Sequence, residues 1–155
     1  MRSNLRTVII GVGNAYSGDD AAGLVAAQRL REVASDRAMI LTETGDPARL
    51  IEAWKGADTA VIIDAMRSNT RPGAIRRLDA GAQQIPRDLL RYSTHRFGVA
   101  DAIELARVVN ALPSHVIIYG IEGRHFQAGA GLSLEVEKAV GRVVELVMGE
   151  LQTEV

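Results

Sequence analysis

The 155-residue sequence contains no cysteine, and its charges almost cancel, giving a formal net charge of -1 at pH 7. Without thiols, the chain cannot form disulfides, use a thiolate nucleophile or build a zinc or iron–sulfur site on cysteine ligands. The small net charge gives no electrostatic reason to expect nucleic acid or an anionic membrane as a partner. These absences leave carboxylate, imidazole and hydroxyl groups as the carriers of any chemistry.

Long apolar runs are missing as well. None approaches the roughly 20 residues of a membrane span, and the polar segment before Val8 lacks the apolar core of a signal peptide. We therefore expect a cytoplasmic protein. Hydrophobic residues make up 47% of the chain and charged residues 24%, an ordinary globular composition. This length predicts one domain over residues 1–155, and the oligomeric state is left open.

Short apolar runs alternate with amphipathic segments along the chain. Strands are predicted at Thr7–Val12, Met39–Thr42, Ala60–Asp64 and Val116–Ile121, with a weaker one at Ala74–Leu78. Helices are predicted over Asp20–Val33, Pro47–Trp54, Val99–Leu112 and Ser133–Val147, the last with a serine that can cap it. This alternation predicts right-handed crossovers and hence a three-layer α/β/α domain, with helices flanking a twisted, mostly parallel sheet.

The segment Gly11–Gly23 is the most informative part of the sequence. An apolar run leads through glycines and a polar loop to Asp19 and Asp20, where a helix should begin. Gly-x-Gly after a strand usually indicates a phosphate site, but Tyr16 replaces the third glycine. The paired aspartates also put negative charge where a phosphate would bind. The loop is better suited to a cation than to a nucleotide. Tight turns and close helix–strand contact are expected at Gly11, Gly13 and Gly23.

Polar residues follow several of the predicted strands. In open α/β sheets, ligand sites form beyond the carboxyl ends of the strands, so these residues are expected to converge. We favour a site built from Asp20, Asp64 and His95. Two carboxylates and one imidazole suit a borderline divalent metal such as nickel, zinc or cobalt better than calcium. No contiguous metal-binding motif joins the three residues, so only the fold could bring them together.

Each of these residues also has a structural explanation. Asp19 and Asp20 could cap the helix and complement its dipole, or Asp19 could cap while Asp20 points inward. Asp64 ends an apolar run, so its carboxylate needs hydrogen bonds, a nearby arginine or another cation. His95 could be a surface histidine of its loop.

Other polar residues also allow more than one interpretation. A nucleophilic triad could combine Ser93 or Ser17 with His95 and Asp64, but the sequence has no Gly-x-Ser-x-Gly elbow. Asn14 is expected to hydrogen-bond the backbone of the glycine loop or to occupy a left-handed turn. Two more histidines are expected to be structural or exposed in loops, although the second could line the site: His115 and His125.

Arginines gather in the second half of the sequence. We interpret them as a solvated basic rim; the alternative is a surface that attracts an acidic or carboxylate-bearing partner. The residues are Arg67, Arg71, Arg76, Arg77, Arg87, Arg91 and Arg96.

Five segments, in order, resemble the hydrogenase maturation protease family: residues 10–14 with 19–23, 61–65, 93–95, 119–122 and 131–136. Members are endopeptidases that trim the C-terminal extension from the large-subunit precursor of nickel–iron hydrogenases. The resemblance implies a twisted sheet flanked by helices and a site in which Asp20, Asp64 and His95 contact the metal. It also implies that nickel is borne by the substrate and engaged transiently, with no permanent organic cofactor.

One segment departs from the family's pattern. Many members carry an Asp-Gly-Gly-Thr-like turn after the second strand, whereas this chain has Thr42–Pro47. The difference bears on how the substrate is held, and we predict Asn14, Asp19 and Glu43 as loop residues beside it. The hydrolytic base is left open among metal-activated water, Asp19 and a metal-free carboxylate. The alternative function is a nickel-checkpoint or chaperone module that binds the same precursor without cutting it.

Overall fold

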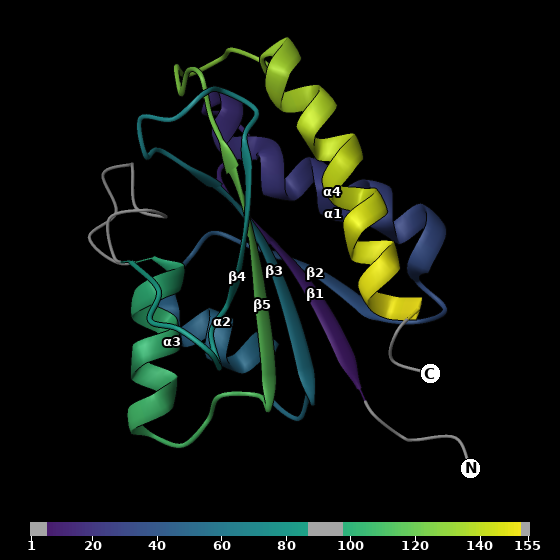
Figure 1. Cartoon of the computed structure of the whole chain (residues 1–155), viewed down its shortest axis with the longest axis vertical. Helices are drawn as coiled ribbons and strands as arrows, with labels where there is room; N and C mark the ends of the chain where they lie inside the picture. The colour runs from purple at the N-terminus through teal and green to yellow at the C-terminus, as the bar shows by residue number, and fades with distance from the viewer. Residues whose placement is uncertain (1–5, 87–97, 153–155) are drawn as a thin grey trace.

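The computed structural model describes residues 6–86 and 98–152. Within these ranges, five strands form one sheet in the order β2-β1-β3-β5-β4 (Figure 1). The strands are β1 (Thr7–Val12), β2 (Met39–Glu43), β3 (Thr59–Met66), β4 (Ile75–Asp79) and β5 (His115–Glu122). The first three and β5 run parallel, whereas β4 pairs with β5 in the antiparallel direction. The predicted twisted, mostly parallel sheet is confirmed.

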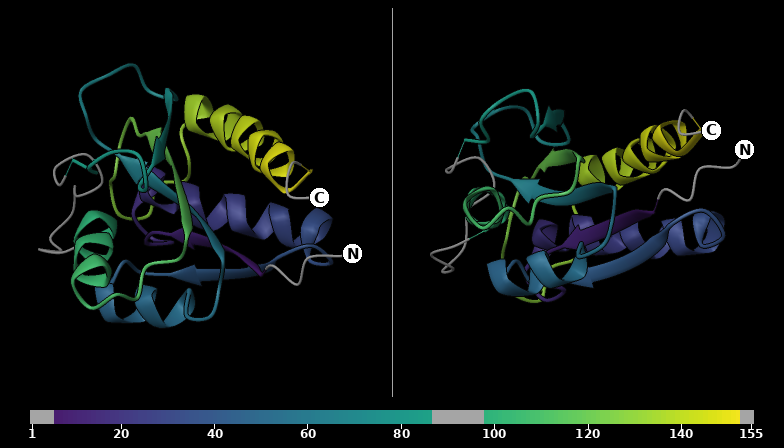
Figure 2. Two further views of the ribbon diagram at one scale, coloured as in Figure 1. Left: turned by 60° about the horizontal axis from the view of Figure 1, so that its bottom comes forward. Right: turned by 90° about the horizontal axis from the view of Figure 1, so that it is seen from below.

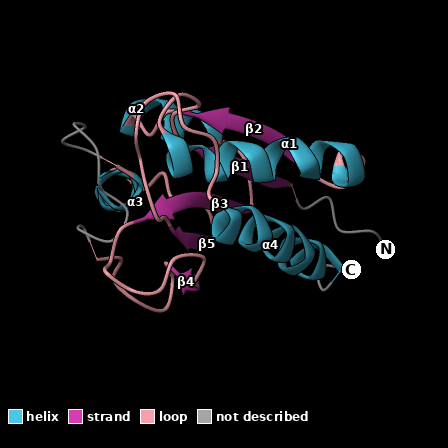
Figure 3. Cartoon of the chain, turned by 90° about the horizontal axis from the view of Figure 1, so that it is seen from above, coloured by secondary structure: helices cyan, strands magenta, loops and turns pink. Residues whose placement is uncertain are grey.

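Helices cover both faces of the sheet. A short 3-10 helix, η1 (Gly18–Ala21), leads into α1 (Ala22–Ala34), and the others are α2 (Pro47–Ala53), α3 (Val99–Val108) and α4 (Leu134–Gln152). Helices α1 and α4 lie together on one face and α2 and α3 on the other (Figures 2 and 3). This arrangement confirms the three-layer α/β/α prediction.

The apolar strand residues divide between two cores. In β1, Ile10 belongs to the core under α2 and α3, whereas its neighbour Ile9 belongs to the core under α1 and α4. Successive strand residues point to opposite faces, and both faces here are covered. A parallel strand buried on both sides must be apolar throughout, which is why the central strands read as continuous hydrophobic runs.

The helix ends differ from the predicted bounds where tertiary contacts decide them. Helix α3 stops at Val108 instead of Leu112 because the chain turns at Asn110, whose φ is +58°. Helix α4 continues to Gln152, five residues beyond the predicted end, because Leu151 is buried in the core under α1 and α4. The predicted cap is present, since the Val136 amide donates to Ser133 Oγ at 3.4 Å. No helix in the described ranges is long and apolar enough to cross a membrane.

The direction of the strands defines the edge where the site lies. The parallel strands β1, β3 and β5 end near Val12, Met66 and Glu122, so the segments that follow them share the carboxyl edge of the sheet. Helix α3 also begins toward this edge, because its other end leads within a few residues to the start of β5 (Figure 1).

Candidate functional site

Glycines allow the loop after β1 to pack directly on the sheet. A Cβ atom on Gly13 would lie 2.0 Å from the Asp20 carbonyl oxygen, and one on Gly23 would lie 2.2 Å from the Ile63 carbonyl oxygen. A Cβ on Gly11 would meet the Gly23 carbonyl oxygen at 2.2 Å. The expected close approach of helix and strand is confirmed, and it places η1, which carries Asp19 and Asp20, against the ends of β1 and β3.

Asp20 and Asp64 are buried at this edge, and one oxygen of each lacks a partner in the described residues. Their exposed fractions are 4% and 3%, and the Oδ1 atom of each has no hydrogen-bond partner in the part of the chain that the structure describes. Nor does any described arginine form an ion pair with Asp64, the structural alternative that its sequence position left open. An unpaired buried carboxylate is costly, so this pair is suited to bind a proton or a cation.

The electrostatics of the two carboxyl groups agree with this conclusion. Burial raises the pKa of Asp20 to about 6, although the backbone amide of Asn14 opposes the shift. Burial, followed by the negative charge of Asp20, raises the pKa of Asp64 well above its ordinary value, against the amide of Ala65. Two carboxylates that disfavour each other's charge bind protons, or a shared cation, more readily than isolated ones.

Asp19, the immediate neighbour of Asp20, has a different environment. Its Oδ2 accepts from the amides of Arg124 and His125 at 2.8 and 3.1 Å and from Ser133 Oγ at 2.8 Å. Its Oδ1 accepts from the Ser133 amide at 2.7 Å. Burial would raise the pKa of Asp19, but these hydrogen bonds outweigh it and lower the pKa. The Asp19 side chain therefore stays ionised and holds the loop after β5.

The prediction that Asp19 caps its own helix is thus wrong. The residue before η1 is Ser17, and η1 has no side-chain cap hydrogen bond. Asp19 lies inside η1, and its own amide donates to the His125 carbonyl oxygen at 2.9 Å. The donors that reach its carboxylate come from more than a hundred residues away in the chain, so local sequence could not reveal them.

Glu122, the last residue of β5, is a second buried carboxylate with a full set of donors. It is 2% exposed and accepts from the Ser68 amide at 3.0 and 3.1 Å, from Ser68 Oγ at 2.5 Å and from Thr70 Oγ1 at 2.9 Å. It therefore fixes the loop that follows β3. Two features of the sequence pointed to this role. Glu122 is a carboxylate at the end of an apolar strand, and the small polar residues Ser68 and Thr70 follow another strand that ends at the same edge.

Asn14 and Glu43 also lie at the carboxyl edge. Asn14 Oδ1 accepts from the Tyr16 amide at 2.9 Å, which confirms the expected backbone hydrogen bond. The Glu43 carbonyl oxygen accepts from the Gly13 amide at 3.0 Å, and its carboxylate lies 3.9 Å from Arg49 Nη1. Asn14 is exposed and Glu43 half-buried. Their predicted role beside the substrate stays a prediction.

The remaining predicted site residues, His95 and Ser93, lie outside the described residues. Ser17, the other serine of the triad alternative, is half-buried and contributes its amide to a turn with Asn14. Among residues 6–86 and 98–152, no three His, Cys, Asp or Glu side chains are placed to hold a metal ion together. The described donors are thus two carboxylates, a set that fits a divalent metal only if further ligands join it.

The two other histidines differ in position. His115 is the exposed first residue of β5, as expected. His125 is half-buried against the site loop, where a Cβ on Gly18 would lie 3.1 Å from His125 Nδ1. Gly18 has a φ of +56°, so both its backbone conformation and the space beside it favour glycine. His125 therefore lies against the residue that precedes Asp19 and Asp20.

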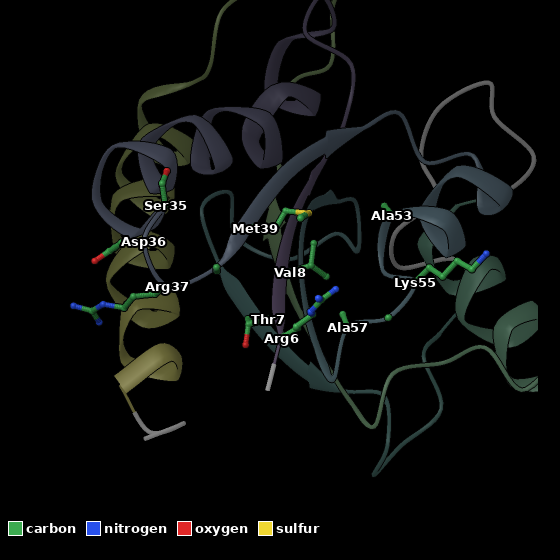
Figure 4. Close-up of a pocket in the computed structure, with 12 residues that line it drawn as sticks. Arg6, Thr7, Val8, Ser35, Asp36, Arg37, Met39, Ala53, Lys55 and Ala57 are labelled. Atoms are coloured by element: carbon green, nitrogen blue, oxygen red, sulfur yellow. The ribbon is translucent and has the colours of Figure 1, made fainter. Parts of the chain in front are cut away.

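A surface pocket of about 580 Å³ is found elsewhere, at the amino edge of the sheet (Figure 4). Its lining includes Arg6, Val8, Asp36, Met39 and Lys55, and none of the predicted site residues. The Lys55 and Arg37 side chains extend outward from it rather than converging on its centre (Figure 4). Pocket size therefore does not locate the candidate site, which is defined by its buried carboxylates.

The chain is similar to known proteins over most of its length. The family model of hydrogenase maturation proteases matches residues 26–150. The chain is 26% identical to the hydrogenase 2 maturation protease of Escherichia coli over 152 residues, covering 96% of this chain and 92% of that protein. It is 24% identical to the hydrogenase expression/formation protein HupD of Thiocapsa roseopersicina, covering 96% of this chain and 68% of HupD.

The fold has the same relatives. The hydrogenase maturating endopeptidase HybD from E. coli superposes with a TM-score of 0.75 at 23% identity, covering 96% of this chain and 93% of HybD. The chain therefore belongs to the hydrogenase maturation protease family. Membership in this family makes the protein a peptidase that acts in hydrogenase maturation.

Proposed function

We propose that this chain removes the C-terminal extension of a nickel–iron hydrogenase large-subunit precursor after nickel has been inserted, and that it recognises the nickel in that substrate. The observation that carries the proposal is the buried pair Asp20 and Asp64, whose Oδ1 atoms have no hydrogen-bond partner in the described chain. A cation delivered by the substrate would give these oxygens the partner they lack.

His95 completes the proposed set of metal contacts. It precedes Gly98, the N-cap residue of α3, by three positions in the sequence. Helix α3 begins toward the carboxyl edge of the sheet, where Asp20 and Asp64 lie. With only three contacts from the protein, other positions around the nickel stay available to the substrate's own ligands.

The carboxyl groups differ in what they can do during hydrolysis. A pKa of about 6 lets Asp20 accept or donate a proton near neutral pH. Asp64 keeps one oxygen, Oδ1, without a donor in the described chain and responds to the charge of Asp20. Asp19 is occupied on both oxygens, so we assign the base to the Asp20–Asp64 pair, or to water activated by the substrate's nickel, rather than to Asp19.

The substrate would reach this site from the exposed side of the β1–α1 loop. Asn14 and Tyr16 are exposed there, and Glu43 lies at the end of the neighbouring strand β2. We propose that these loops contact the precursor around the scissile bond. Processing of a newly made large subunit would take place in the cytoplasm.

The experiment that tests the function is mass spectrometry of hydrogenase large-subunit precursors, with and without inserted nickel, after incubation with this protein. We expect loss of a short C-terminal peptide from the nickel-loaded form alone. The same assay with the double variant Asp64→Asn, His95→Ala should leave the precursor intact. Unchanged processing by that variant would overturn the assignment of these residues.

The same assay distinguishes cleavage from the alternative function, binding of the precursor without cleavage. A nickel-checkpoint or chaperone module would form a complex with the nickel-loaded precursor without releasing a peptide. Gel filtration of the incubated mixture, followed by mass spectrometry of the complex, distinguishes a bound intact precursor from a bound or released product.

A further inference from the structure

One arginine at the carboxyl edge is exposed but fixed in position. Arg67 directly follows β3, three residues after Asp64. Its Cζ atom lies 4.5 Å from the centroid of the Phe126 ring, a cation–π contact with the loop after β5. Two segments distant in sequence therefore meet beside the candidate site through this pair.

The aromatic partner is itself held in place. A Cβ atom on Gly123 would lie 2.4 Å from Phe126 Cζ, so the ring packs on the Gly123 backbone. The loop that carries Phe126 is bound by Asp19, which accepts from the amides of Arg124 and His125. The Phe126 ring that contacts Arg67 therefore belongs to a loop held by Asp19, the residue adjacent to Asp20.

The backbone on either side of Arg67 is fixed as well. The Met66 carbonyl oxygen accepts from the Gly123 amide at 3.0 Å, and the Ser68 amide and hydroxyl both donate to the buried Glu122. Because Arg67 lies between two hydrogen-bonded neighbours, its side chain starts from a defined position. The cation–π contact with Phe126 already restricts the side chain, so less conformational entropy would be lost when a ligand binds it.

Arg67 nonetheless has no carboxylate partner within the described ranges. Other described arginines do: Arg124 pairs with Glu135 at 2.6 Å and Arg77 with Glu150 at 2.7 Å. A guanidinium group presents several donors in one plane and matches a carboxylate with two parallel hydrogen bonds. The Arg67 donors are therefore free to bind a ligand at the edge of the sheet where Asp20 and Asp64 lie.

We infer that Arg67, supported by Phe126, binds a carboxylate of the precursor and so positions the segment that is cut. The inference rests on the proposed function and adds a specificity residue to it. Within the described chain Arg67 forms no ion pair or hydrogen bond with Asp20 or Asp64, so its role is to hold the substrate rather than to transfer protons. For Arg67, this inference favours the alternative stated for the arginines of the sequence, a surface that attracts a carboxylate-bearing partner.

The test compares Arg67→Gln with Arg71→Gln in the cleavage of the nickel-loaded precursor. Arg71 is the matched control, because it is exposed in the same loop and without a cation–π contact or an ion pair in the described structure. We expect Arg67→Gln to raise KM at least ~10-fold with kcat unchanged, and Arg71→Gln to stay within about twofold. Arg67→Lys should recover only part of the loss, because lysine cannot form two parallel hydrogen bonds.

The carboxylate is identified by substituting each Asp and Glu near the precursor's cleavage site by Asn or Gln. One substitution should reproduce the KM effect with the wild-type protein and add nothing to Arg67→Gln, as expected for two groups that interact. Equal effects of Arg67→Gln and Arg71→Gln, or a loss in kcat alone, would overturn the inference.

Failure of the proposed function gives a different result. If wild-type protein binds the precursor but releases no peptide, the proposed cleavage is wrong, and calorimetric binding of the same precursor takes the place of KM. A Kd raised by Arg67→Gln and not by Arg71→Gln would still support the docking of a carboxylate. An unchanged Kd would refute it, as would wild-type protein that binds no precursor.

Discussion

Two pairs of buried carboxylates occupy the same edge of the sheet and have opposite environments. Asp19 and Glu122 accept hydrogen bonds from four and three groups of the neighbouring loops. Asp20 and Asp64 each retain an Oδ1 with no partner in the described residues. The carboxylates of the first pair are hydrogen-bonded to loops and hold them in place. Those of the second pair can still bind a proton or a cation. Asp19 and Asp20 are adjacent in sequence, so residue type and position alone do not distinguish a structural carboxylate from a reactive one.

The largest expected effect comes from removing the reactive pair. In the peptide-release assay with nickel-loaded precursor, Asp64→Asn or Asp20→Asn should lower activity by about 10³-fold or more. Unfolding by urea should show no loss of stability at pH 7, because the amide removes a buried charge without changing the shape of the side chain. A variant that loses both activity and several kcal/mol of stability would erase the distinction between the two pairs.

Removing the charge of Asp19 should reverse that outcome. Asp19→Asn puts an amide group where the carboxylate accepts hydrogen bonds from Arg124, His125 and Ser133, leaving buried donors unpaired. We expect a loss of about 4 kcal/mol in the free energy of unfolding, measured by urea denaturation. Asp20→Asn is the matched control one residue away. Equal stability of the two variants would contradict the structural role of Asp19.

The dependence of the free energy of unfolding on pH should distinguish Asp20 from Asp19. The folded-state pKa of Asp20 is raised to about 6 from an ordinary value of 3.8, so the folded protein binds its proton more tightly than the unfolded chain. Its contribution is fully present below pH 4 and is lost as pH rises through 6. Over the whole of this transition, the stability that Asp20 contributes should fall by ~3 kcal/mol in metal-free protein. Asp64 acts in the same direction, and Asp19, whose pKa is lowered, acts in the opposite one.

Urea denaturation at several pH values between 4 and 7 tests this expectation. Asp20→Asn should remove the decrease that Asp20 contributes to the wild-type curve, so the stability of the variant should fall less steeply with rising pH. Identical slopes for the wild type and the variant would show that Asp20 does not titrate in this range.

The smallest effect is expected at Glu122. Glu122→Gln keeps one carbonyl oxygen that can still accept from Ser68, and the loop it holds is partly exposed. We expect a loss of about 1 to 2 kcal/mol in the free energy of unfolding. Hydrogen exchange of the Ser68 amide should also become faster, while exchange in β1 is unchanged. A loss as large as that of Asp19→Asn would show that the two loops depend equally on their carboxylates.

The element order was predictable because burial imposes a period on the sequence. Strand β1 has its predicted bounds, and the other parallel strands lie within two residues of theirs, since strands covered on both faces must be apolar. The direction of β4 could not be predicted, because an antiparallel edge strand and a parallel one have similar patterns over five residues. The shortened α3 and lengthened α4 follow from a turn at Asn110 and from burial of Leu151.

The sequence by itself determined the class of fold and the edge of the sheet at which polar residues would meet. It also indicated where glycines allow helix and strand to approach closely after β1. Hydrophobic periodicity and steric limits are local properties, so they can be read from neighbouring residues. Only the tertiary structure decided which carboxylates are satisfied. The donors to Asp19 come from residues 124–133 and those to Glu122 from residues 68–70, and no donor in the described chain reaches Oδ1 of Asp20 or Asp64. Partners so distant in sequence exist only after the sheet has brought the loops together.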